Sequence, residues 1–128
     1  MSAMDLWGDF VAEPIRTPVA VLREQATLLS PKTEGLISAE VTTEVYDGEF
    51  IHAFELVVPT LQFYRYRLFE VRHSSTLYPV RVIAERTGPR LTDPFVDDEE
   101  AFTDWLRGIL SSDKTKKIIS SLLAQAKS

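Results

Sequence analysis

The stretch that decides the fold is Val41–His52, VTTEVYDGEFIH. Apolar and polar residues alternate on both sides of Asp47-Gly48, which is the pattern of two strands with one buried face. An Asp-Gly pair between such strands favours a type I′ turn, because both residues tolerate positive φ. This turn fixes the pairing of the two strands, and Val41 is then expected to face Phe54.

The same alternation continues to Arg86 and predicts two further strands, joined by a three-residue loop after Pro59 and another over 74–76. The sequence therefore predicts a four-stranded antiparallel meander. The two later registers are expected to be those that keep one face apolar, since a slip of one residue sends every side chain to the other face. The central row of this inner face is expected to hold four residues: Val41, Phe54, Leu68 and Val82.

Helical signals flank the strands. Thr17-Pro18 is an N-cap with proline at the first helical position, and it predicts a helix near 18–29 that Pro31 ends. Two C-terminal helices are expected, with these caps: Asp97 or Asp98, and Ser111 or Ser112. The prediction is one α+β domain over 1–128 of order α-β-β-β-β-α-α, with the helices on the inner face and a loop over 87–96. Residues 1–16 are expected to be poorly structured or to dock.

Composition restricts the possible functions. The chain has 128 residues, of which 14 are basic and 19 acidic, and 45% are hydrophobic, as in one globular domain. It has no cysteine, which excludes disulfides, thiolate metal sites and cysteine nucleophiles. No apolar run is long enough to span a bilayer and no signal peptide is recognisable, so we expect a cytoplasmic protein without a membrane partner.

The middle of the chain is basic although the whole protein is acidic. Residues 61–90 contain six Arg and two Glu. With the chosen registers, the face of the meander away from the helices, here called the outer face, mixes Arg with apolar side chains. We expect seven of its residues to form a binding surface: Arg65, Arg67, Phe69, Arg81, Ile51, Val71 and Ile83. Apolar side chains left in water on one patch favour a protein partner or a homodimer.

Two other functions are compatible with the sequence. Arg65, Arg67 and Phe69 on an open sheet are the residue types that clamp and stack single-stranded nucleic acid, although the motifs of the common RNA-binding domains are absent. His52 and Glu70 are expected beside each other on the inner face, near Thr43, which predicts a possible enzymatic site. The main prediction remains a non-catalytic interaction domain of the adaptor, chaperone or neutralising type, with no cofactor and no metal site.

Overall fold

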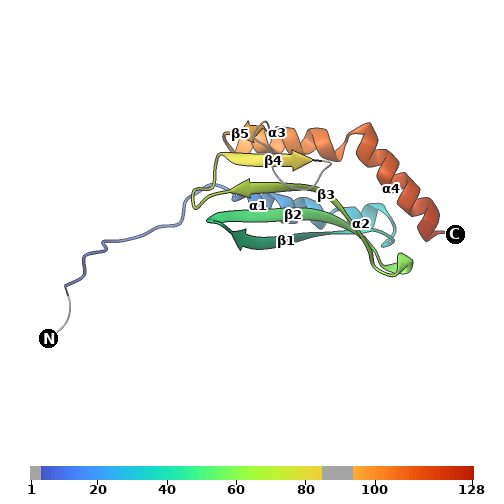
Figure 1. The fold of residues 1–128 in the computed structure, drawn as a ribbon, viewed down its shortest axis with the longest axis horizontal. Coiled ribbons are helices and arrows are strands. Elements are labelled where there is room, and N and C mark those ends of the chain that lie inside the picture. Colours follow the sequence, from blue (N-terminus) through green and yellow to red (C-terminus); the bar gives the residue numbers. More distant parts are fainter. Residues whose placement is uncertain (1–3, 85–93) are drawn as a thin grey trace.

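The fold is an α+β domain built on an antiparallel sheet, as predicted. The computed structural model describes residues 4–84 and 94–128. The sheet has five strands in the order in which they occur in the chain (Figure 1). They are β1 Ser38–Tyr46, β2 Glu49–Val58, β3 Tyr64–His73, β4 Val80–Ala84 and β5 Phe95–Val96, and a 3-10 turn, η1 Pro59–Leu61, joins β2 to β3. The sequence predicted the first four of these strands.

The β1–β2 hairpin forms in the predicted register. Asp47 and Gly48 have φ values of 50° and 77°, as a type I′ turn requires. Val41 pairs with Phe54, and the pairing continues without interruption to Ser38 and Val57. The turn residues therefore determined this half of the sheet.

The β2–β3 register changes within the strands. Glu55 pairs with Arg67 as expected, but a β-bulge follows and Phe54 pairs with Phe69 instead of Leu68. A bulge adds one residue to one strand, so every side chain beyond it changes face. The predicted outward orientation of Phe69 and Val71 is therefore wrong.

The β3–β4 register is also different from the predicted one. Val71, and not Leu68, pairs with Val82, because β4 begins only at Val80 and the connection is longer than three residues. The predicted loop over 87–96 lies mostly outside the described residues, and its last two residues, Phe95 and Val96, form β5 against β4.

Of the four helices in the described part of the chain, three have starts that are recognisable in the sequence. The bounds of the four are α1 Pro18–Ala26, α2 Leu29–Lys32, α3 Glu99–Leu110 and α4 Asp113–Ala126. Side chains of Thr17, Asp98 and Ser112 accept hydrogen bonds from backbone N–H groups in the first turns of α1, α3 and α4. The single helix predicted over 18–29 is two helices, and Pro31 lies inside the short second one.

The core lies between the helices and the inner face of the sheet. Phe54 stacks on Phe69 with ring centroids 5.1 Å apart, and Trp105 of α3 meets Phe69 edge-on. Leu68 and Phe69 are both buried in this core, since the bulge directs two consecutive side chains inward. The four residues predicted for the inner row all contribute to it: Val41, Phe54, Leu68 and Val82.

Candidate functional site

The outer face retains five of the seven residues predicted for it. Arg65 and Arg67 precede the position where the bulge changes the register, and Arg81, Ile51 and Ile83 share their face. The other two residues, Phe69 and Val71, are fully inside the core. The aromatic ring on which the nucleic-acid hypothesis depended is therefore absent from this face.

Charges on the outer face are paired across three strands. Arg65 bridges Glu40 at 2.6 Å and Glu55 at 3.5 Å. Arg67 continues the chain by bridging Glu55 at 3.9 Å and Glu70 at 3.3 Å. Glu70, buried and only 3% exposed, also binds Arg72 at 3.2 Å. These guanidinium groups already have carboxylate partners within the protein, so they offer little unsatisfied charge to a ligand.

The apolar side chains Ile51 and Ile83 of the outer face are also removed from water. Ile51 and Ile83 are 5% and 1% exposed. Long charged side chains cover apolar neighbours with their methylene stems, and several stand on this face. The expectation of an open apolar patch here is therefore wrong. Exposed rings remain at the margins of this face: Tyr46 at the end of β1, 71% exposed, and Phe95 of β5, which lies under the Arg81 guanidinium, 5.0 Å from it. Phe95 was not predicted to belong to the sheet, because a two-residue strand has no periodicity.

A row of polar side chains crosses the inner face, but not the predicted one. The Thr43 hydroxyl lies 2.8 Å from His52 Nδ1, and His52 Nε2 lies 2.9 Å from His73 Nε2. Glu70 lies on the opposite face, bound to Arg67 and Arg72. The predicted pairing of His52 with Glu70 is therefore wrong, for the same reason as Phe69: the bulge reverses the two faces.

Hydrogen bonding assigns the protons along this row. His73 Nδ1 lies 2.7 Å from the carbonyl oxygen of Ser74, which can only accept, so this nitrogen donates. His73 Nε2 then accepts from His52 Nε2, and His52 Nδ1 accepts from Thr43. Burial, assisted by nearby His73 and Arg23, lowers the pKa of His52 to about 4. Within residues 4–84 and 94–128, no group of three or more His, Asp or Glu side chains could hold a metal ion.

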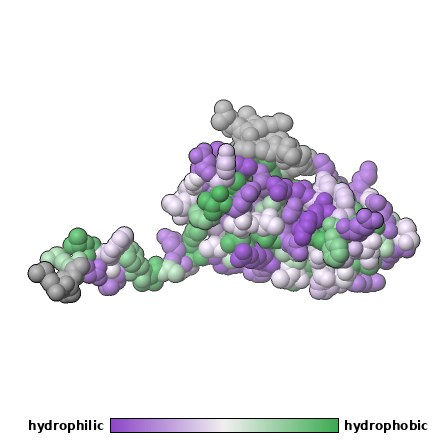
Figure 2. All heavy atoms as spheres, turned by 60° about the horizontal axis from the view of Figure 1, so that its bottom comes forward, coloured by the Kyte–Doolittle hydropathy of each residue, from purple (hydrophilic) through white to green (hydrophobic). Residues whose placement is uncertain are grey.

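The N-terminal segment, defined here as Met4–Ile15, is the most exposed apolar part of the described chain. Its large side chains project into solvent: Met4, Leu6, Trp7, Phe10, Val11 and Ile15. Trp7 is 80% exposed and Val11 93% exposed, and Trp7 contacts only Phe10 among the rings, at 6.1 Å. Figure 2 shows the segment as a projection with hydrophobic residues along it, well outside the body of the domain.

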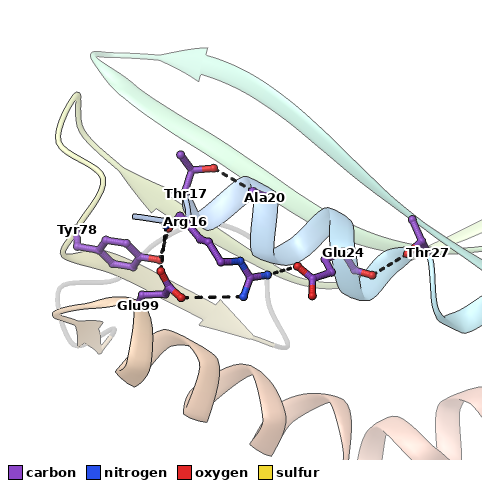
Figure 3. Close-up of polar contacts among 7 residues, drawn as sticks. All are labelled: Arg16, Thr17, Ala20, Glu24, Thr27, Tyr78 and Glu99. Carbon is purple, nitrogen blue, oxygen red and sulfur yellow. Dashed lines mark hydrogen bonds and ion pairs between the residues drawn. The ribbon is translucent and has the colours of Figure 1, made fainter. Parts of the chain in front are cut away.

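The base of this segment is firmly attached to the domain (Figure 3). The backbone N–H of Arg16 donates to Glu99 at 3.0 Å, and the Arg16 guanidinium forms an ion pair with Glu24. Tyr78 donates its hydroxyl to the carbonyl oxygen of Arg16 at 3.3 Å. Burial and the neighbouring Glu99 carboxylate raise the pKa of Tyr78 to about 12, so it remains a donor. The segment therefore leaves the domain from a fixed point.

Two cavities open between the helices on the inner side of the sheet. The first, of about 200 Å³, separates α1 and α2 from α3 and α4, and its lining is mainly apolar: Leu28, Leu29, Leu56, Leu68, Leu110 and Ile119. The second, of about 320 Å³, lies between α1 and α3 and shares Gln25 and Leu110 with the first. We call the two together the helix groove. It reaches Arg16, the residue that directly follows the N-terminal segment.

None of the helices in the described part of the chain has the length and apolar character needed to cross a bilayer. Comparisons with protein-family models, with curated proteins and with solved structures found no match. Residues and geometry are therefore the basis for inferring function.

Proposed function

We propose that this protein is a non-catalytic interaction module that binds a protein partner through its N-terminal segment. The observation that carries the proposal is the exposure of six large apolar side chains on one short, extended stretch, Met4–Ile15. Soluble monomers rarely leave such a concentration of apolar surface in water, and burying one of these side chains stabilises a complex by roughly 1.5–3 kcal/mol.

The composition of the segment supports a protein partner. Trp and Phe are enriched among the residues that dominate binding free energy at protein interfaces, and Trp7 and Phe10 are both present. Asp5, Asp9 and Glu13 keep the free segment hydrated and favour a partner with cationic groups beside an apolar surface. An acidic segment is repelled by phosphates, which opposes nucleic-acid binding by this part of the chain.

This proposal moves the predicted interaction from the outer face to the N-terminus. On the outer face Arg65, Arg67 and Arg72 already pair with carboxylates, and Ile51 and Ile83 are buried. On the N-terminal segment neither the apolar side chains nor the acids are covered. The proposal thus keeps the function expected from the sequence, a non-catalytic interaction domain, and assigns binding to the N-terminal segment.

Site-specific photo-cross-linking in cells tests the proposal. A photoreactive amino acid replaces Phe10 in one variant and Phe63, an equally exposed ring on the body, in the control. We expect a discrete cross-linked polypeptide from position 10 that the additional substitution Trp7→Asp abolishes, and none from position 63. The proposal is wrong if position 10 gives no such product, or gives the same products as position 63.

A further inference from the structure

We propose that the helix groove of one copy of this protein binds the N-terminal segment of a second copy, so that two chains exchange their segments in a homodimer. This inference rests on the proposed function and names its partner. It also gives the predicted homodimer an interface other than the outer face.

The N-terminal segment has the pattern of an amphipathic helix. At about 100° per residue, Leu6, Trp7, Phe10 and Val11 fall within an arc of about 140°. Asp5 and Asp9 lie on the other side of such a helix, and Glu13 lies at the edge of the apolar arc. Asp5 Oδ1 already accepts a hydrogen bond from the Trp7 backbone N–H at 2.9 Å, which is an N-cap contact. The segment is extended in the free protein, with Gly8 at φ 75°, and we infer that it becomes a short helix, up to Pro14, on binding an apolar surface.

The helix groove offers such a surface. It lies between two pairs of helices over the sheet, and Leu28 and Lys32 on its rim are exposed. Binding of an amphipathic helix in an apolar groove is a recurring mode of peptide recognition. The cavities of about 200 and 320 Å³ are neighbours that share Gln25 and Leu110 in their linings, and each has room for an aromatic side chain.

Charges on the two surfaces are complementary. Three cations line the helix groove, Arg16, Lys32 and Arg107, and none of its described lining residues is acidic. Arg16 already pairs with carboxylates of α1 and α3, and Arg107 pairs with Asp104, so Lys32, exposed at the rim, is the cation that favours an acidic ligand. The segment carries three acids: Asp5, Asp9 and Glu13. Opposite charges orient the two surfaces and disfavour the reversed arrangement.

The direction of the segment favours a second copy over its own groove. It continues outward from the N-terminal end of α1, away from the sheet and the helices (Figure 1). Pro14 and Pro18 flank its base, and residues that precede proline are held in extended conformations; Thr17 has ψ 154°. A sharp reversal at the base is therefore disfavoured, so a segment that folds into a helix keeps its outward direction and meets the groove of another molecule.

Because one chain carries both complementary surfaces, two copies related by a two-fold axis satisfy both contacts at once. Sedimentation velocity over a concentration series tests this. We expect the wild type to dimerise and Trp7→Asp to weaken the dimer at least about 30-fold, as the loss of an interface hot spot does. Leu28→Glu should weaken it similarly by placing a like charge opposite the acidic segment. Leu28 is half exposed, so its variant is expected to fold normally, which circular dichroism checks.

A matched control and a mixing experiment complete the test. Phe63 is 69% exposed and has a φ of 57°, a conformation that aspartate tolerates, so Phe63→Asp should dimerise as the wild type does. Trp7→Asp and Leu28→Glu should each be monomeric alone but form a heterodimer when mixed, since one intact segment then meets one intact groove. A mixture that stays monomeric overturns the inference.

Cross-linking from position 10 separates this inference from the proposed function. A product joined to a peptide of the helix groove of another copy supports both. A product with a different protein leaves the proposed function intact and overturns the exchange. A wild type that stays monomeric into the millimolar range, with Trp7 fluorescence already typical of a buried ring, shows the segment in its own groove and also overturns the exchange. Absence of any product overturns both.

Discussion

The outer face and the N-terminal segment both combine apolar and charged side chains, yet these side chains are buried or paired on the outer face and exposed on the segment. On the outer face, Glu70 lies between Arg67 and Arg72, and Ile83 is almost completely removed from water. On the segment, the apolar side chains stand in solvent. The difference teaches that a mixed composition does not by itself identify a binding surface. A binding surface is better identified by exposed side chains that have no partner within the chain.

The largest effect expected from this comparison concerns Phe69, which the register places in the core and not on the outer face. Phe69→Ala should lower the free energy of unfolding by about 3–5 kcal/mol, since it opens a cavity among buried rings. Phe95→Ala, at an exposed ring of the same sheet, should cost less than about 1 kcal/mol. Urea denaturation of both variants measures the difference. Equal losses would mean that the bulge is misplaced.

A second prediction concerns the ion pairs of the outer face. Glu70→Ala should cost about 3 kcal/mol, because it leaves a largely buried guanidinium uncompensated. Glu40→Ala should cost at most about 1 kcal/mol, although Glu40 approaches Arg65 more closely, because both groups are about half exposed. The burial of the ion pair, and not the distance between its atoms, should decide which substitution costs more stability. Denaturation at low and high salt tests this, and only the Glu40 contribution should decrease with salt.

A third prediction uses the pH dependence of the polar row on the inner face. The pKa of His52 is lowered to about 4 in the folded protein, so the unfolded chain binds more protons between pH 4 and 6.5. The contribution of neutral His52 to the free energy of unfolding is present above pH 6.5 and is lost as the pH falls through this range. The loss is about 2 kcal/mol between pH 7 and pH 5. In His52→Gln that part of the pH dependence should disappear. An unchanged slope would contradict the buried position of His52.

The smallest effect on stability is expected in the N-terminal segment. At concentrations at which the wild type is monomeric, Trp7→Asp should change the free energy of unfolding by less than about 0.5 kcal/mol, since Trp7 contacts little of the folded body. Chemical denaturation at low concentration measures this. A large loss would mean that Trp7 packs on its own domain, and the contrast with the outer face would then fail.

The fold was largely predictable from local signals. Asp47-Gly48 specified the first hairpin, and Thr17, Asp98 and Ser112 marked three helix starts that the structure confirms. Alternation predicted the β2–β3 register correctly as far as Glu55 and Arg67, but it could not predict the pairs beyond the bulge or the β3–β4 register, because a bulge breaks alternation. The adjacent apolar residues Leu68 and Phe69, followed by Glu70, were the sequence signal for the bulge. Two consecutive side chains of one strand can both face the core only where a bulge inserts a residue.

The candidate site was predictable only in part. The exposed apolar residues of the N-terminal segment were visible in the sequence, but their exposure depends on whether the body covers them, which is a tertiary property. The helix groove is formed by elements far apart in the chain, α1 with α2 and α3 with α4, so no local pattern reveals it. His73 was missed as the partner of His52 because the bulge alone brings them into contact.

Isotope-filtered NMR on a mixture of labelled and unlabelled chains tests the exchange most directly. Nuclear Overhauser contacts should connect the rings of Trp7 and Phe10 in one copy with methyl groups of Leu28 and Ile119 in the other. Rings that show no contact to these methyl groups, or contacts only within one copy, would contradict the exchange.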